Sequence, residues 1–173
     1  AATLSSEYAP ATFESKLARA EVAVQRVPQA DLAARLARMK MINDARTVRY
    51  DQALVEGQAA IEGFAQRRRI AAQIETSLDL LRVRQSRATA EDVAIVGRTL
   101  STLHQLAATE LGDGHEVMRQ VKIYEAGWAW TNGDVAGAHR RLQALVRSWP
   151  NPEGRPIAGR VVDATGAPVS GAI

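Results

Sequence analysis

Apolar residues recur every three or four positions through most of the chain, and this spacing predicts helices with one buried face. One such series is Val93, Val96, Leu100, Leu103, Leu106 and Leu111, and a second is Val135, Ala138, Leu142, Leu145 and Trp149. Proline is absent between Pro28 and Pro150, and the intervening span is rich in Ala, Leu, Arg, Glu and Gln. This composition favours helix. The pattern therefore predicts an all-α domain over residues 1–150.

Turn and cap residues divide this domain into five predicted helical segments. The first covers Thr12–Arg26, because proline at position 28 disfavours helical backbone at the preceding residue. The second begins near Gln29 and could run to about Ser86. A helix of that length is unusual, so we expect a break or kink within it, at Gly57 or Gly63.

Cap and turn signals bound the other three segments. Thr89 is an expected cap for a helix that runs to Leu111, with acidic residues in its first turn. Glycines at 112 and 114 end that helix, and the fourth spans residues 115–131. An Asn-Gly turn and a capping Asp134 introduce the fifth, which ends at Trp149. Short turns between amphipathic helices predict antiparallel packing, as in a helical bundle or a short helical array.

The last 23 residues change in character, and they predict a second, different fold. Residues 151–156 contain two prolines and a glycine and resemble a linker. Residues 157–163 have the composition of a strand, residues 164–167 that of a turn, and Pro168 opens another extended segment. The expected element is a C-terminal β-strand or hairpin stub, which has no core of its own.

The net positive charge does not by itself indicate that the protein binds nucleic acid. The formal net charge is +3, and the whole excess lies in residues 1–50, which hold 8 Lys or Arg and 5 Asp or Glu. A phosphate-binding surface needs a clustered basic face. The chain has only three lysines, and arginine keeps its charge to a very high pH, which explains the high isoelectric point.

Residue types that carry catalysis or bind metals are scarce. The chain has no cysteine, which excludes disulfides, thiolate-bound zinc, iron–sulfur clusters and cysteine nucleophiles. His104, His115 and His139 lie far apart on separate predicted elements, and His115 suits a helix cap. No phosphate-binding loop, nucleophile elbow or HExxH pair is present. We therefore predict a protein that is not an enzyme and that uses no metal or cofactor.

Two features are candidate partner-binding residues. The densest basic run is Arg67, Arg68 and Arg69, which would contact an acidic partner or anionic lipid headgroups, or would form a solvated helix face. In the fourth predicted helix, Tyr124 and Trp128 share a face with apolar residues and are expected in the core, whereas Trp130 points elsewhere.

Residues Lys122–Pro150 resemble one tetratricopeptide unit. The matching positions are Ala126, Gly127, Ala129, Gly133, Ala138, Leu142, Leu145 and Pro150. Small residues would let two helices approach closely, and glycine would form the turn between them. No second copy is evident upstream, so the earlier helices are either diverged repeats or this pair is a generic helical hairpin.

Residues 157–173 resemble the opening of the carboxypeptidase regulatory-like domain family. The shared positions are Gly159, Val161, Asp163, Gly166, Pro168, Val169, Gly171 and Ala172. The resemblance implies a non-catalytic β-sandwich of secreted, periplasmic or cell-surface proteins. Because only 17 residues match, the sequence would be a fragment of a longer exported bacterial protein, and its start at Ala1 rather than Met agrees with processing.

Three functions remain open. The first is a non-enzymatic helical interaction or scaffold module, bound to a protein partner in the cell envelope or outside the cell. The second is a regulatory or substrate-capturing domain of a larger secreted enzyme. The third is an arginine-mediated binder of nucleic acid or anionic lipid, which the small excess of basic residues disfavours. No stretch is long and apolar enough to span a membrane, so any membrane association would come from parts outside this sequence.

Overall fold

The chain folds into a series of helices. The computed structural model describes residues 10–26 and 30–148, and these form seven helices and no strand. The helices are α1 (Pro10–Arg26), α2 (Ala30–Arg46), α3 (Tyr50–Gln66), α4 (Ile70–Arg87), α5 (Ala90–Glu110), α6 (Glu116–Thr131) and α7 (Val135–Ser148). The all-α prediction is confirmed for this part of the chain. The predicted linker and the predicted β-stub lie outside the described residues.

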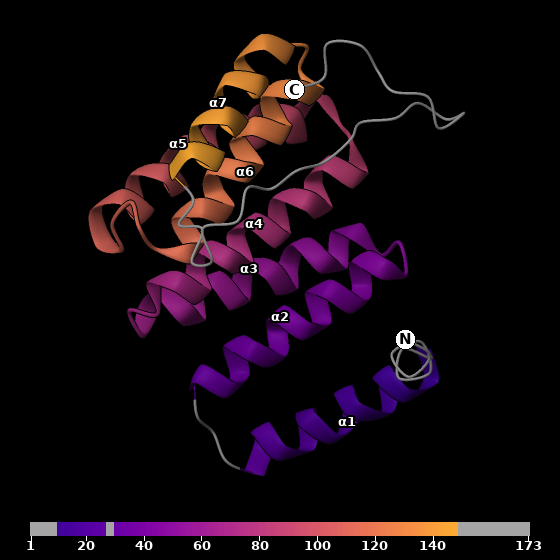
Figure 1. Cartoon of the computed structure of the whole chain (residues 1–173). Coiled ribbons are helices and arrows are strands. Elements are labelled where there is room, and N and C mark those ends of the chain that lie inside the picture. Colours follow the sequence, from indigo (N-terminus) through magenta and orange to yellow (C-terminus); the bar gives the residue numbers. More distant parts are fainter. Residues whose placement is uncertain (1–9, 27–29, 149–173) are drawn as a thin grey trace, which may run out of the picture.

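Each helix packs mainly on its neighbours in sequence. In Figure 1, α1 lies at one end of the molecule, α2, α3 and α4 follow it, and α5, α6 and α7 form the other end. Contacts of α4 with α5 and, to a lesser extent, with α6 join the two halves. The helices α2 to α5 begin 20 residues apart, at residues 30, 50, 70 and 90, so short antiparallel hairpins make up much of the array.

The largest hydrophobic cluster joins α4, α5 and α6. Its buried residues are Ile74, Leu78, Leu81, Val96, Leu100, Leu103, Ala107, Val117, Met118 and Val121. Three apolar positions of the series predicted for α5 are therefore core residues, whereas Val93 is exposed. Smaller clusters around Met41 and Phe64 fill the space between α2, α3 and α4. The core thus runs along the array from helix to helix.

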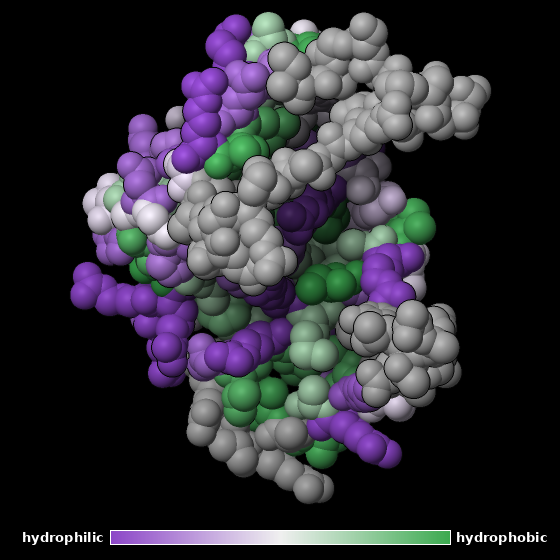
Figure 2. Space-filling view, in the orientation of Figure 1, coloured by the Kyte–Doolittle hydropathy of each residue, from purple (hydrophilic) through white to green (hydrophobic). Residues whose placement is uncertain are grey.

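Apolar side chains are partly exposed at the end of the array that holds α1 and α2. In Figure 2, hydrophobic residues reach the surface in the lower part of the view, over α1 and α2. Val22 of α1 and Leu32, Met39 and Ile42 of α2 are all partly exposed. An ion pair of 2.8 Å between Lys40 Nζ and Glu21 Oε1 also joins the two helices.

The second predicted segment is interrupted, but not at Gly57 or Gly63. That segment consists of three helices, α2, α3 and α4, and the chain turns at residues 47–49 and 67–69. Gly57 and Gly63 lie inside α3. A Cβ at Gly63 would lie 2.9 Å from Ala34 Cβ, and a Cβ at Gly57 would lie 2.6 Å from Met41 Sδ. The two glycines let α2 approach α3 closely, and the prediction that they interrupt a helix was wrong.

Three interhelical turns share one geometry. In each, a residue with positive φ occupies the middle position: Val48 (φ 62°), Arg68 (φ 53°) and Gly133 (φ 84°). The following amide donates to a carbonyl five residues earlier, as Asp134 N does to Ala129 O at 2.9 Å. The Asn-Gly turn predicted before α7 is confirmed. Sequence reasoning missed the other two turns because valine and arginine do not signal a left-handed residue.

The predicted helix caps are present. Thr89 Oγ1 accepts a hydrogen bond from Asp92 N at 3.1 Å, and His115 Nδ1 accepts one from Val117 N at 3.1 Å. Asp134 Oδ1 accepts one from Gly137 N at 2.8 Å. Each side chain satisfies an amide at a helix N-terminus that has no partner within the helix.

A buried carboxylate fixes the junction of α4 and α5. Asp92 has no exposed surface, and its oxygens accept hydrogen bonds from Arg84, Arg87 and the Thr89 hydroxyl at 2.6–3.0 Å. Arg87 also reaches Asp51 on α3 at 2.9 Å. The hydrogen bond from Arg87, supported by those from Thr89 and Arg84, holds the pKa of Asp92 well below its usual range against the opposing effect of burial. Three helices therefore meet at one ionic network.

Candidate functional site

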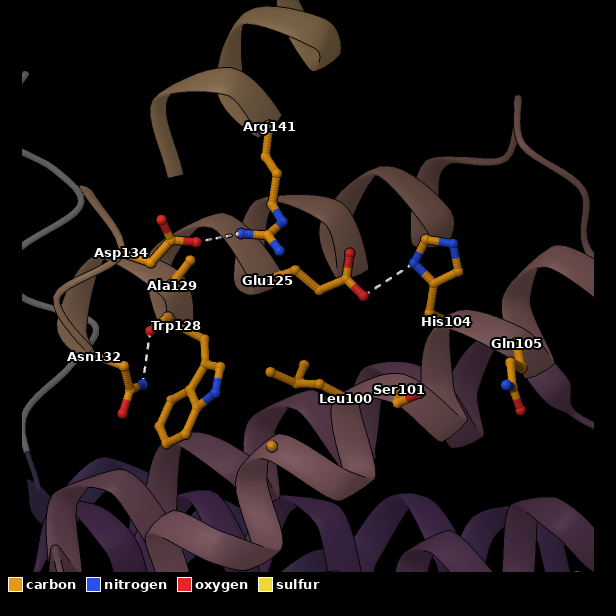
Figure 3. A pocket seen from close by; sticks show the side chains of 11 residues that line it. Leu100, Ser101, His104, Gln105, Glu125, Trp128, Ala129, Asn132, Asp134 and Arg141 are labelled. Atoms are coloured by element: carbon orange, nitrogen blue, oxygen red, sulfur yellow. Dashed lines mark hydrogen bonds and ion pairs between the residues drawn. The ribbon is translucent and has the colours of Figure 1, made fainter. Parts of the chain in front are cut away.

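A groove runs between α5 and α7, with α6 as its floor. Within the described residues, α5 and α7 make no direct backbone contact, and both pack on α6. Two cavities of about 530 and 450 Å³ lie along this line and share His104, Glu125 and Arg141. We call this trough the α5–α7 groove. Figure 3 shows it with side chains from all three helices and from the turn before α7.

The floor of the groove combines an aromatic ring with small and aliphatic residues. Trp128 packs against the main core cluster, and Leu100, Ala129 and Leu145 add apolar surface along the groove. The indole Nε1 lies near Gly97, where an added Cβ would be 3.7 Å away. Within the part of the chain that the structure describes, this N–H has no hydrogen-bond partner and is not sealed from solvent. It is therefore a free donor in the groove.

A histidine and a glutamate meet at the centre of the groove. His104 on α5 and Glu125 on α6 approach to 2.9 Å between Nδ1 and Oε1 (Figure 3). An ionised carboxylate only accepts hydrogen bonds, so Nδ1 carries the proton in this contact. The opposite ring nitrogen, Nε2, remains available to a ligand. The two side chains also tie α5 to α6.

The wall on the α7 side has a cation that is only loosely held. Arg141 Nη1 lies 3.5 Å from Asp134 Oδ2, a long contact, and half of the arginine side chain is exposed. Farther along α6, Lys122 Nζ contacts Asp113 Oδ1 at 3.0 Å. This hydrogen bond lowers the pKa of the Asp113 carboxyl. Arg141 can therefore leave Asp134 and bind a ligand with little loss of stabilising free energy.

The groove presents several groups that could bind a ligand. It offers the Trp128 N–H, the free nitrogen of His104, the Arg141 guanidinium and the side chains of Ser101 and Gln105 over an apolar floor. Among the described residues, no group of three or more His, Asp or Glu side chains could hold a metal ion. This combination of hydrogen-bond donors, acceptors and apolar surface can bind a ligand that has both polar and apolar groups.

The three aromatic residues of α6 lie where the sequence predicts. Tyr124 and Trp128 face the core, and Trp130 is 59% exposed. The Tyr124 hydroxyl donates to Gln85 Oε1 at 2.6 Å, and burial raises the pKa of this tyrosine to about 12. Trp130 does not line the α5–α7 groove.

The run of three arginines forms the turn between α3 and α4, and so it is not a helix face. Arg67 follows α3, Arg68 holds the positive φ, and Arg69 precedes α4. Arg69 lines another cavity, of about 610 Å³, together with Arg35 and Arg38 of α2. Carboxylates neutralise part of this charge, since Asp31 contacts both Arg35 and Arg69.

Sequence reasoning missed the residues that line the α5–α7 groove. His104 and Glu125 are 21 positions apart, and Arg141 lies on a third helix. No local motif joins them, because each sits on a different helix and only the packing of α5, α6 and α7 brings them together. The one available signal was a histidine on the half-buried side of a helix.

Comparisons with known proteins identify no relative of this chain. The chain matches no protein-family model, no curated protein and no solved structure. None of the described helices has the length and hydrophobicity needed to cross a membrane.

Proposed function

We propose that this chain is a non-enzymatic helical interaction module that binds an extended segment of a protein partner in the α5–α7 groove. In this proposal it is a scaffold within an exported bacterial protein. The tetratricopeptide-like pattern of the α6–α7 hairpin agrees with such a role, since helical arrays present concave surfaces to protein segments.

The open form of the groove is the observation on which the proposal depends. Two helices that do not touch flank a floor with free hydrogen-bonding groups, and the trough continues past Arg141 to the end of α7. An extended peptide presents backbone donors and acceptors at regular intervals, so it can satisfy the Trp128 N–H and the free nitrogen of His104 together.

Several arginines are paired with carboxylates inside the fold, and this pairing disfavours nucleic acid as the partner. Arg38 contacts Glu75 and Asp79, and Arg84 and Arg87 both contact Asp92. A guanidinium held by a carboxylate within the fold is not available to neutralise a phosphate. Weak dependence of partner binding on salt is therefore expected.

Export and the scaffold role rest on the resemblance of residues 157–173 to a β-sandwich module. The neighbouring coding sequence tests this part of the proposal. Further β-sandwich domains would support a scaffold, whereas a catalytic domain would favour a regulatory or substrate-capturing module of an enzyme.

Site-specific photocrosslinking in the producing cell tests the groove. A photoreactive phenylalanine at Gln105 lies in the groove, and the same residue at Gln52 on α3 is an exposed control. We expect a discrete protein adduct from position 105 and none from position 52.

A blocking variant sharpens this test. Gly97→Phe places a ring at the Trp128 end of the groove and should abolish the adduct at position 105, with an unchanged circular dichroism spectrum as the check on folding. Equal adducts at positions 105 and 52, or an adduct that survives Gly97→Phe, would contradict binding in the groove.

A further inference from the structure

The cavity that contains Arg69 lies between α2 and α4. Its volume is about 610 Å³, which is within the range of small-molecule binding sites. Side chains of α2, of the last turn of α3, of the turn before α4 and of the first two turns of α4 line it. We call it the α2–α4 cavity. None of its lining residues lines the α5–α7 groove.

One part of the lining is apolar. Phe64 of α3 is buried, and Ile70 and Ala71 at the start of α4 pack against the main core cluster. On the α2 side, Met39 is 36% exposed and Ile42 is 39% exposed. A bound molecule that covers these side chains removes apolar surface from water, which favours binding.

Two guanidinium groups of the lining share a single carboxylate. Arg35 Nε donates to Asp31 Oδ2 at 3.0 Å, whereas Arg69 Nε lies 3.7 Å from Asp31 Oδ1, which is too long for a hydrogen bond. The two arginine side chains are 66% and 62% exposed. Neither the Nη atoms of Arg35 nor any side-chain nitrogen of Arg69 donates a hydrogen bond to a residue that the structure describes. The pair therefore has one uncompensated positive charge and several free donors.

The third arginine of the lining is already fully paired. Arg38 Nε and Nη2 donate to Asp79 Oδ2, and Nη1 donates to Glu75 Oε2, at 2.7 to 3.1 Å. Asp79 also accepts a hydrogen bond from Arg82 at 2.7 Å. These two carboxylates are thus balanced by two arginines of their own, and the excess positive charge beside Asp31 remains.

We propose that the α2–α4 cavity binds a small organic acid, with its carboxylate on Arg35 and Arg69 and its apolar body against the apolar lining. A guanidinium presents paired N–H groups that match a carboxylate, and the position of Asp31 shows that one carboxylate can face both arginines. The combination favours a ligand with both parts over an inorganic anion or a neutral apolar molecule. This site shares no residue with the α5–α7 groove, so either proposal can fail without the other.

Isothermal titration calorimetry of the full chain, in a buffer without carboxylate, tests the proposal with four probes. Octanoate and 2-naphthoate have a carboxylate on an aliphatic and on an aromatic body, acetate lacks the body, and octylammonium has the opposite charge. We expect saturable binding of octanoate or 2-naphthoate, at least tenfold weaker binding of acetate, and no binding of octylammonium. The preferred body, aliphatic or aromatic, identifies the class of acid.

Three matched variants locate the carboxylate of the ligand. Arg69→Gln should weaken binding of the preferred acid at least fivefold. Arg67→Gln removes the same charge from the same turn, at a residue that does not line the cavity, and should leave the affinity within about twofold. Asp31→Asn removes the competing carboxylate and should tighten binding at least threefold, which a merely structural role of Asp31 would not produce. Circular dichroism checks that each variant keeps its helices.

Four results would overturn the proposal. The first is absence of saturable binding of both larger acids, and the second is equal affinity for them and for acetate or octylammonium. The third is an equal loss of affinity in Arg67→Gln and Arg69→Gln, which would indicate attraction to the basic turn as a whole. The fourth is binding that Asp31→Asn leaves unchanged or weakens.

Discussion

Replacement of Asp92 by asparagine should destabilise the fold strongly, because it removes the charge at the junction of α3, α4 and α5. The carboxylate is fully buried and accepts four hydrogen bonds, two from Arg87, one from Arg84 and one from Thr89. Asparagine keeps the volume but leaves two guanidinium groups facing a neutral amide. The arginines remain where they are, without their counter-charge.

The expected magnitude follows from the burial of the partners. Loss of one member of a buried ion pair destabilises by about 3 to 5 kcal/mol. Arg84 and Arg87 keep 22% and 27% of their side-chain surface exposed, so water can recover part of the loss. We expect the lower end, about 3 kcal/mol, and a drop in melting temperature of about 6 to 12 °C.

Asp51 provides a matched control for this measurement. It contacts the same Arg87 at 2.9 Å but is 91% exposed. Asp51→Asn should therefore lower the free energy of unfolding by less than about 1 kcal/mol. Urea titration followed by circular dichroism at 222 nm measures both variants. Similar losses in the two variants would refute the argument that burial of Asp92 sets its contribution.

Acid should reduce the difference in unfolding free energy between the wild-type chain and the Asp92→Asn variant. The pKa of Asp92 is lowered in the fold, while an unfolded aspartate titrates near about 3.9. The carboxylate therefore stabilises the fold fully above that value, and the stabilisation fades as the pH falls below it. The gap in unfolding free energy should stay constant from about pH 7 to about pH 5 and narrow as the pH falls from about 4 towards about 2. A gap that stays constant below about pH 4 would contradict the lowered pKa.

Backbone and packing substitutions give three further tests by urea titration. Val48→Gly should stabilise by about 0.5 to 1 kcal/mol, because a β-branched residue is strained at φ 62° and glycine is not; a loss of stability would refute the turn geometry. Gly63→Ala should destabilise by about 1 to 2 kcal/mol through its contact with Ala34, and Ala34→Gly in the same chain should restore part of the loss. Gly127→Ala should stabilise by up to about 1 kcal/mol, since nothing lies within 4 Å of the added Cβ.

The sequence alone was sufficient to predict the helices that begin at a capping residue or follow a recognisable turn. Thr89, His115 and Asp134 cap the helices that they were expected to cap, and the Asn-Gly turn lies before α7. The apolar spacing in α5 marks its buried face, with Val96, Leu100 and Leu103 in the core. In these cases the amide that needs a partner and the side chain that supplies it are within three residues of each other, so the sequence contains the whole interaction.

Tertiary packing decided the rest, because the determining contacts join residues far apart in the chain. Val48 and Arg68 adopt a left-handed backbone that nothing near them in sequence predicts, since the packing of α2 on α3 and of α3 on α4 favours the turn over a continuous helix. The glycines of α3 were expected to break a helix, yet Gly63 lies against Ala34 in the closest part of the α2–α3 contact. The α5–α7 groove exists only because α7 folds back on α6 without reaching α5. Periodicity shows which side of each helix is apolar, but which of those sides stays exposed depends on its neighbours.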